Sequence, residues 1–212
     1  MKLYIDGCSE TAIKIAEDFN LGITTNPTII LRDRPGETIE EVIERLKLAK
    51  VPEIFVHLET FDESILSLID PSKFVIKLPW IRNKYDLALT FKKAGFRVCA
   101  TAVYTPQQIV SAVLFGVNYV AFYFDRSSKK GFDPREKLSC FISMINKTKG
   151  ELTVIVASLK TIEQVIEAIN AGATHLTVPV ELFEQLLQED EMALNDAFEF
   201  SRDFAKLVRN FP

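Results

Sequence analysis

Short apolar runs alternate with amphipathic stretches along the whole chain. Most of the apolar runs are rich in β-branched or aromatic residues, as strands are. Several are apolar on both faces, which is typical of strands that lie between covering helices and a central core. The pattern therefore predicts eight strands, at residues 2–6, 22–25, 53–58, 73–78, 96–101, 118–123, 152–157 and 174–178.

The amphipathic stretches between these runs predict helices. The first begins at Ser9, a residue type favoured at helix N-caps. Gly95 and Gly172 each follow a helical pattern, at the position where a left-handed residue commonly ends a helix. The predicted helices are residues 9–19, 37–49, 62–69, 84–94, 105–115, 133–147, 161–171 and 180–188.

Eight strand–helix units in 212 residues predict one α/β domain. Regular alternation favours a parallel sheet with right-handed crossovers, and eight units suit the closed (β/α)8 TIM barrel. An open doubly wound sheet is the competing architecture. That fold usually carries a G-x-G-x-x-G phosphate loop after its first strand, and the segment IDGCSE does not match it. We expect the barrel to occupy residues 1–188.

Residues 189–212 add one further helix, expected at about 192–209, with two apolar faces. It could close one end of the barrel, or it could contact a neighbouring subunit. One face carries Leu194, Ala197, Phe198, Ser201, Phe204, Ala205 and Val208, and the other carries Phe200, Leu207 and Phe211.

Composition and charge exclude several classes of protein. The formal net charge is −4, which gives no electrostatic reason to bind nucleic acid or an anionic membrane. No apolar run approaches the roughly 20 residues that span a bilayer, and the N-terminus does not resemble a signal peptide. Three separated cysteines and two histidines favour neither a disulfide framework nor a metal site. We expect a cytoplasmic protein without a metal or another cofactor.

Lys77 is the most informative single residue. It lies near the C-terminal end of the fourth strand, where TIM barrels place their active sites, and it shares an inward face with Val75. Burial of a lysine lowers its pKa and makes the free amine available to attack a ketone. The alternative is a structural lysine that reaches solvent or pairs with a carboxylate.

Other polar residues end neighbouring strands. In a closed barrel these strand ends meet at one mouth. Each residue alone could be a cap or a turn residue, and TTNP at 24–27 could be only a turn. Together they favour a site around Lys77. They are Asp6, Asn26, Thr101, Tyr123 and Ser158.

Cationic residues follow the sixth and seventh strands. Arg126, Ser158 and Lys160 lie there, and a helix N-terminus follows the last of them. These are suitable ligands for a phosphate, in the part of the barrel that often binds one. A solvated surface pair is the alternative interpretation.

His57 ends the third strand, two residues before Glu59. The two could form an acid–base pair or orient a water, although His57 could also be a buried structural histidine. His175 is early in the eighth strand and belongs to the opposite end of the barrel.

The motifs YID at 4–6, GITTNPTII at 22–30, FVIKLP at 74–79, TAVYT at 101–105 and VASLKT at 156–161 resemble the transaldolase family. The likeness is strongest to its small members, the fructose-6-phosphate aldolase and short transaldolase group. It covers nearly the whole chain and keeps the motif order.

The resemblance implies a role for each site residue. Lys77 corresponds to the Schiff-base lysine, and Asp6 and Asn26 to residues that bind substrate hydroxyls and assist proton transfer. Thr101 matches a threonine that positions the catalytic water. Arg126, Ser158 and Lys160 match the phosphate-binding set. The resemblance also implies a homo-oligomer, a pentamer or decamer, in which the C-terminal helix reaches a neighbouring subunit.

Three positions bear on how far the resemblance extends. His57 stands where the family has Glu or Gln, at a position that holds the catalytic water. Tyr123 follows the aldolase pattern, whereas most transaldolases have Phe. Residues 6–8 read Asp-Gly-Cys, whereas the family usually has Thr after the Asp.

We therefore expect a class I enzyme that moves or releases a dihydroxyacetone unit from a ketose phosphate such as fructose 6-phosphate. Tyr123 favours aldolase activity, and the family at large favours transaldolase activity. Two alternatives stay open: a phosphosugar isomerase with Glu59 as its base, and a non-catalytic oligomeric binding protein.

Overall fold

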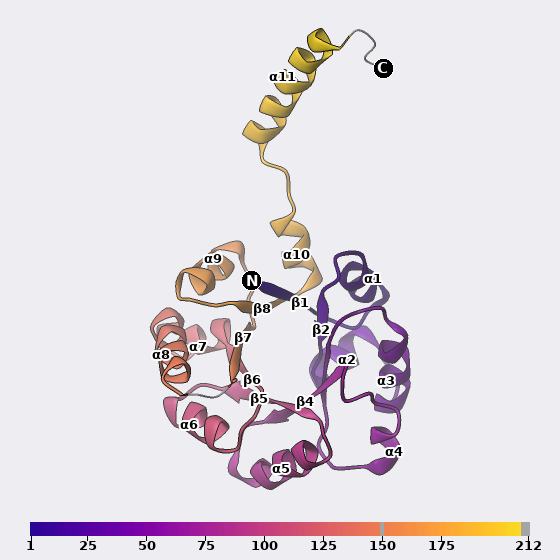
Figure 1. Ribbon diagram of the computed structural model, residues 1–212, viewed down its shortest axis with the longest axis vertical. Coiled ribbons are helices and arrows are strands. Elements are labelled where there is room, and N and C mark those ends of the chain that lie inside the picture. The colour runs from indigo at the N-terminus through magenta and orange to yellow at the C-terminus, as the bar shows by residue number, and fades with distance from the viewer. Residues whose placement is uncertain (149–150, 209–212) are drawn as a thin grey trace.

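The computed structural model describes residues 1–148 and 151–208 as a closed barrel of parallel strands with helices around it (Figure 1). The strands follow chain order around the ring, and β1 pairs with β8 to close it. They are β1 (Lys2–Asp6), β2 (Gly22–Thr24), β3 (Ile54–His57), β4 (Phe74–Pro79), β5 (Arg97–Val103), β6 (Tyr119–Tyr123), β7 (Thr153–Ala157) and β8 (His175–Val178). The (β/α)8 prediction is confirmed.

The predicted helices form with small changes at their ends. The side chain of Ser9 caps the first helix by accepting a hydrogen bond from the amide of Ala12. Gly95 and Gly172 have φ angles of 87° and 99° just after their helices, as expected. The bounds are α1 (Glu10–Asp18), α3 (Ile39–Leu48), α4 (Glu63–Leu66), α5 (Tyr85–Lys93), α6 (Pro106–Leu114), α8 (Pro134–Asn146), α9 (Ile162–Asn170) and α10 (Val180–Leu186).

Three short helical segments were not predicted, and all three follow strands at the mouth of the barrel. They are α2 (Pro27–Asp33), α7 (Phe124–Lys129) and a 3-10 turn, η1 (Arg82–Lys84). Asn26 caps α2 by accepting a hydrogen bond from the amide of Ile29, and Pro27 occupies the first helical position. The TTNP segment that could have been only a turn is therefore a strand end and the start of a helix.

The last helix, α11 (Glu191–Leu207), projects away from the barrel (Figure 1). None of its described residues is buried, and Phe198 and Phe200 are 72% and 71% exposed. The helix therefore does not close an end of the barrel within this chain. Residue 209 of the predicted helix and Phe211 lie outside the described residues. No helix in the described part of the chain is both long enough and apolar enough to cross a membrane.

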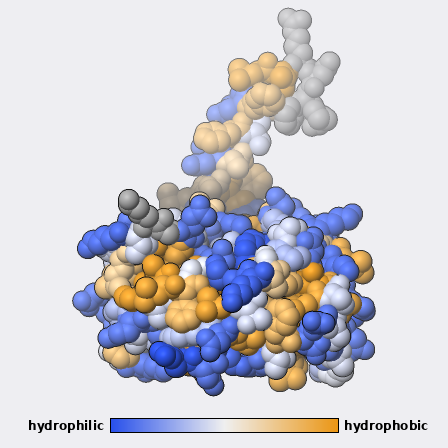
Figure 2. Space-filling view, turned by 60° about the horizontal axis from the view of Figure 1, so that its bottom comes forward, coloured by the Kyte–Doolittle hydropathy of each residue, from blue (hydrophilic) through white to orange (hydrophobic). Residues whose placement is uncertain are grey.

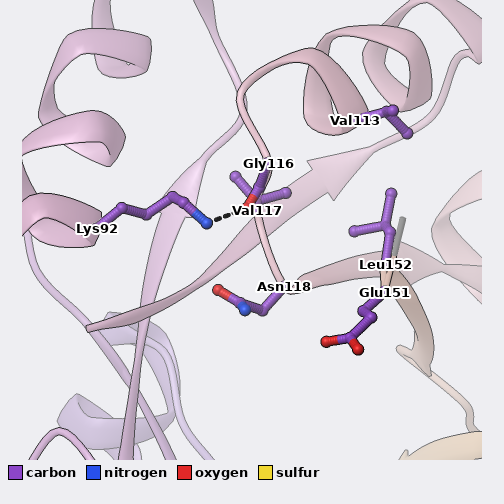
Figure 3. A pocket seen from close by; sticks show the side chains of 7 residues that line it. All are labelled: Lys92, Val113, Gly116, Val117, Asn118, Glu151 and Leu152. Carbon is purple, nitrogen blue, oxygen red and sulfur yellow. Dashed lines mark hydrogen bonds between the residues drawn. The ribbon is translucent and has the colours of Figure 1, made fainter. Parts of the chain in front are cut away.

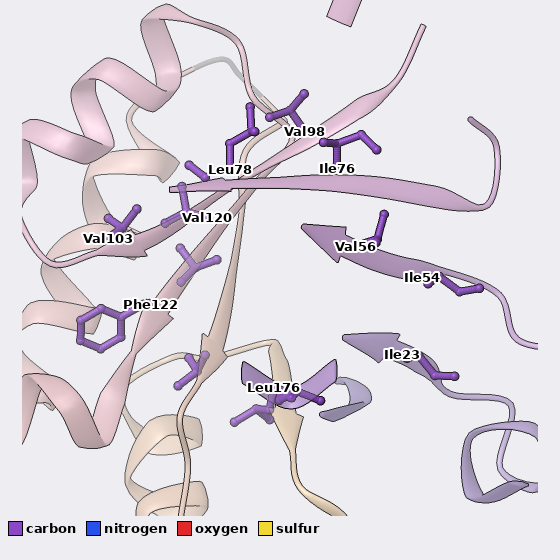
Figure 4. Close-up of a cluster of buried hydrophobic side chains, with 14 of the residues drawn as sticks. Ile23, Ile54, Val56, Ile76, Leu78, Val98, Val103, Val120, Phe122 and Leu176 are labelled. Carbon is purple, nitrogen blue, oxygen red and sulfur yellow. The ribbon is translucent and has the colours of Figure 1, made fainter. Parts of the chain in front are cut away.

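Alternation along the strands separates two cores. Outward-facing residues such as Ile54, Val56 and Ile76 pack beneath the helices (Figure 4). Inward-facing residues fill the barrel itself, so that the barrel is a packed core and not a pore. This inner layer contains Tyr4, Phe55, Val75, Cys99, Ala121 and Ile155.

A buried carboxylate occupies the end of the barrel opposite Lys77. Glu53 is 2% exposed and accepts hydrogen bonds from the hydroxyls of Tyr119 at 2.8 Å and Tyr4 at 2.9 Å. It also pairs with Lys2 and Arg97. Burial raises the pKa of Glu53, but hydrogen bonds from Tyr119 and Lys2 outweigh it and hold the pKa below its ordinary value. This cluster joins β1, β5 and β6 to the residue before β3.

We predict that Glu53→Gln lowers the free energy of unfolding at pH 7 by about 3 kcal/mol, because it leaves Lys2 and Arg97 without their charge partner. A carboxylate with a lowered folded-state pKa contributes stability above its unfolded pKa, about 4.3, and loses it as the pH falls through the folded pKa. The difference between variant and wild type should therefore shrink on acidification. Urea unfolding at pH 7 and pH 4 measures this difference in the free energy of unfolding. Glu44→Gln, at an exposed glutamate, is the matched control. Equal stability of Glu53→Gln and wild type at pH 7 would contradict the prediction.

Candidate active site

One cavity of about 300 Å³ opens at the carboxyl ends of the strands. It contains seven of the nine site residues that the sequence predicted. Thr101 joins it through a hydrogen bond to a lining residue, and His57 does not line it. The lining residues are Asp6, Asn26, Thr28, Ile29, Arg32, Lys77, Tyr123, Asp125, Arg126, Lys129, Ala157, Ser158 and Lys160.

Lys77 reaches this cavity from within the barrel. Its side chain is 5% exposed, and its Nζ donates a hydrogen bond to the carbonyl oxygen of Thr25 at 2.6 Å. In the described part of the chain Lys77 makes no ion pair with a carboxylate. Its one hydrogen bond is to a neutral acceptor, which an uncharged amine can also satisfy.

Asp6 and Asn26 are held by neighbouring groups that leave part of each side chain available. One carboxylate oxygen of Asp6 accepts a hydrogen bond from the hydroxyl of Thr24 at 2.7 Å, and Thr24 contacts Thr177 at 2.6 Å. The side-chain oxygen Oδ1 of Asn26 caps α2 by accepting a hydrogen bond from the Ile29 amide at 3.0 Å. The amide nitrogen of Asn26 and the second oxygen of Asp6 can therefore bind substrate hydroxyls.

Thr101 and Tyr123 form a pair of hydroxyls beside the cavity, with their oxygens 2.6 Å apart. The register of β5 against β6 shifts between Ala100 and Val103, and Ala102 has a φ of 56°. Such irregularities are common next to active sites, where they redirect a side chain. The shift spans Thr101, at the mouth of the barrel.

The cationic side of the cavity is built from the segments after β6 and β7. The guanidinium of Arg126 stacks on the ring of Tyr123, 4.7 Å from its centroid. Ser158 has a φ of 64°, a region that costs a non-glycine residue roughly 1 kcal/mol or more. A strained residue in this position points to a functional constraint on the loop.

Asp125 ties these two segments together. Its carboxylate accepts a hydrogen bond from the side chain of Gln164 at 3.2 Å and pairs with Lys129 at 2.8 Å. Gln164 in turn accepts one from the amide of Lys160 at 2.8 Å. Burial raises the pKa of Asp125, but hydrogen bonds from Lys129 and Gln164 outweigh this effect. The pKa therefore lies below its ordinary value, and the carboxyl is ionised at neutral pH.

Sequence reasoning did not single out six of the lining residues, and five of them lie on the two helices α2 and α7, which were not predicted. Thr28 and Arg32 are on α2, and Lys129 is on α7 together with Asp125. The Asn26-Pro27 pair is a recognisable start signal for α2, and it would have pointed to Thr28 and Arg32.

His57 lies outside the Lys77 cavity, although the two residues are directly paired between β3 and β4. Its Nε2 is 2.5 Å from a carboxylate oxygen of Glu59, which also pairs with Lys84. His57 and Glu59 line a separate, mostly apolar pocket beside α2 that includes Pro27. The expected His57–Glu59 pair is present, but it faces this second pocket.

A further cavity of about 250 Å³ lies near the beginnings of β6 and β7 (Figure 3). It is therefore at the end of the barrel opposite the mouth. Two of its polar side chains, Lys92 and Asn118, already have protein partners. Lys92 donates to the carbonyl oxygen of Gly116, and the side chain of Asn118 accepts from the Val98 amide at 3.0 Å. This arrangement serves the local fold.

The buried thiols are poor nucleophiles. Burial raises the pKa of Cys8 and of Cys99 to about 12, so both stay protonated at neutral pH. Among the described residues, no group of three or more His, Cys, Asp or Glu side chains could hold a metal ion. Lys77 is thus the best placed nucleophile at the mouth of the barrel.

Two comparisons bear on what this site is. The barrel is similar to the solved structure of a double mutant of flavocytochrome b2 with pyruvate bound, with a TM-score of 0.58 and 13% sequence identity. That match covers 84% of this chain and 56% of the other, and it shows the fold alone. The family model described as transaldolase/fructose-6-phosphate aldolase matches residues 3–210. The chain belongs to the transaldolase/fructose-6-phosphate aldolase family.

Proposed function

We propose that this protein is a lysine-dependent aldolase or transaldolase that cleaves a ketose phosphate such as fructose 6-phosphate. The observation that carries this proposal is Lys77, a buried lysine without a carboxylate partner in the described structure, at the edge of a cavity with a cationic side. The pattern suits imine chemistry on a phosphorylated ketone.

In the proposed reaction, the amine of Lys77 attacks the substrate ketone, and loss of water gives an iminium. The iminium accepts the electron pair of the C3–C4 bond as that bond breaks. Asp6 lies in the cavity with one carboxylate oxygen unused by Thr24, and it can take the proton from the C4 hydroxyl. An aldehyde phosphate leaves, and a dihydroxyacetone enamine stays on Lys77.

The Tyr123–Thr101 hydroxyl pair supports the later steps. Its oxygens, 2.6 Å apart, can hold a water and pass a proton to the enamine carbon. Hydrolysis of the resulting iminium releases dihydroxyacetone, which is aldolase chemistry. Attack of the enamine on a second aldehyde phosphate is transaldolase chemistry. The phenol of Tyr123 favours release.

Arg126, Ser158 and Lys160 form the proposed phosphate-binding side. Arg126 and Lys160 make no ion pair in the described part of the chain, so their charges are available to a ligand. Besides Lys77, the cavity is lined by four cationic side chains and two carboxylates, although the chain as a whole carries −4. This local excess of positive charge supports an anionic substrate.

The isomerase alternative is weaker on this geometry. Its candidate base, Glu59, lies outside the Lys77 cavity and is paired with Lys84 and His57. Hydrogen bonds from these two partners lower the pKa of Glu59, which makes its carboxylate a weaker base.

We also propose that α11 packs against a second copy of the chain, in a homo-oligomer such as a pentamer or decamer. An isolated helix that exposes large apolar residues on two faces is unstable in water without a partner. Figure 2 shows apolar side chains along this projecting segment. Met192, Phe198, Phe200 and Leu207 are the most exposed of them.

The first test of the proposed reaction is Lys77→Met, which keeps the length of the side chain and removes the nucleophile. Release of glyceraldehyde 3-phosphate from fructose 6-phosphate, with and without erythrose 4-phosphate as acceptor, should fall by a factor on the order of 10³ or more. Lys14→Met, at an exposed lysine paired with Asp18 on α1, should keep wild-type rates. Wild-type turnover in Lys77→Met would refute the assignment.

The second test concerns assembly. Phe198→Glu combined with Phe200→Glu should convert the oligomer to a species near the 24.0 kDa of one chain, because charges on the apolar faces oppose burial. Light scattering after size exclusion measures the mass, and Glu199→Gln on the same helix is the control. A wild-type protein that already runs as one chain would contradict the proposed role of α11.

A further inference from the structure

Arg32 is a cationic residue of the active-site cavity that lies outside the phosphate-binding set proposed above. It approaches from α2, whereas Arg126, Ser158 and Lys160 approach from the segments after β6 and β7. Its Nε donates a hydrogen bond to Oδ1 of Asp33 at 2.6 Å. The side chain of Asp33 is 7% exposed. A largely buried carboxylate therefore fixes the Nε side of the guanidinium.

Asp33 is itself anchored to the loop that follows Asp6. Its Oδ2 accepts a hydrogen bond from the amide of Cys8 at 2.8 Å. A Cβ at residue 7 would lie 3.3 Å from this oxygen and 3.0 Å from the Cβ of Ala12. The glycine at this position therefore leaves room for the carboxylate that orients Arg32.

The neighbouring Arg34 strengthens the same connection. Its Nε donates to the carbonyl oxygen of Cys8 at 2.8 Å. The end of α2 thus binds both the amide and the carbonyl of Cys8, two residues after Asp6. This double contact gives Arg32 a rigid base and ties its position to that of the β1 carboxylate.

The rest of the Arg32 guanidinium is open. Within residues 1–148 and 151–208 its two terminal nitrogens make no hydrogen bond. The pKa of Arg32 is raised, mainly by its hydrogen bond with Asp33. The negative charges of Asp33, Glu181 and Asp6 add to this effect, and together they outweigh desolvation, which lowers the pKa. Asp6 ends β1, and Glu181 is in the first turn of α10 (Val180–Leu186), which follows β8.

We propose that Arg32 is a specificity-determining residue that binds the substrate phosphate from the α2 side of the cavity, in addition to Arg126 and Lys160. This inference rests on the proposed function, because it assigns a further contact to the same substrate. A guanidinium can give two parallel N–H donors to a phosphate, and Asp33 leaves both terminal nitrogens free for this. The substrate is then clamped by its phosphate between α2 and the segments after β6 and β7.

Arg32→Gln tests the clamp through binding of inorganic phosphate, measured by titration calorimetry. We expect one phosphate per chain in the wild type and a dissociation constant about tenfold higher in the variant, equivalent to about 1.4 kcal/mol. Arg32→Lys should lie between the two. Arg45→Gln removes an arginine that pairs with Glu37 on the surface, outside the cavity, and should bind phosphate as the wild type does.

The selectivity between substrates gives a second readout. The ratio of kcat/KM for fructose 6-phosphate to kcat/KM for fructose should fall about tenfold in Arg32→Gln, since only the phosphorylated sugar uses the contact. Unchanged phosphate affinity would overturn the inference, and so would two phosphates per chain of which Arg32→Gln removes one. Phosphate binding needs no turnover, so the calorimetric result holds whether or not Lys77 forms an imine.

Discussion

Pairing of β1 with β8 closes the sheet, and the position of every candidate site residue depends on that closure. Lys2 to Ile5 are in register with His175 to Val178, which brings the first and last strands of the barrel together. All eight carboxyl ends then face one mouth. Asp6, Lys77 and Ser158 are far apart in sequence, and this ring places them around one cavity.

The two ends of the barrel differ in whether their buried ionisable group has partners of opposite charge. At the closed end, the carboxylate of Glu53 is surrounded by Lys2, Tyr4, Arg97 and Tyr119. At the mouth, Lys77 is buried against a backbone carbonyl. A fully paired cluster stabilises the fold, whereas a buried amine with a single neutral partner is suited to chemistry.

Much of the fold follows from local sequence signals. β-branched runs and helix caps such as Ser9 give nearly all the strands and long helices, and Lys77 is conspicuous because a charged residue interrupts an apolar strand. The short helices α2 and α7, of seven and six residues, lie in segments where one helix per strand was already assigned to a longer amphipathic stretch. Arg32 was missed with α2 for that reason.

Other features depend on contacts between distant segments, which periodicity does not encode. Strand alternation places His57 on the inward face, beside Lys77, but its ring pairs with Glu59 at the edge of another pocket. In the Glu53 cluster, the carboxylate accepts a hydrogen bond from Tyr119, which is 66 residues away in the sequence. Ser158 has a positive φ, and its carbonyl oxygen accepts a hydrogen bond from the amide of Asp125 on α7, a contact between segments that are distant in the sequence.

Borohydride trapping tests the central claim most directly. The protein is incubated with fructose 6-phosphate or dihydroxyacetone, reduced, and analysed by intact mass and peptide mapping. If Lys77 forms an imine with the ketone, we expect one covalent adduct per chain, on the peptide that contains Lys77 and absent from a Lys77→Ala protein. An adduct on another lysine, or none with either ketone, would contradict it.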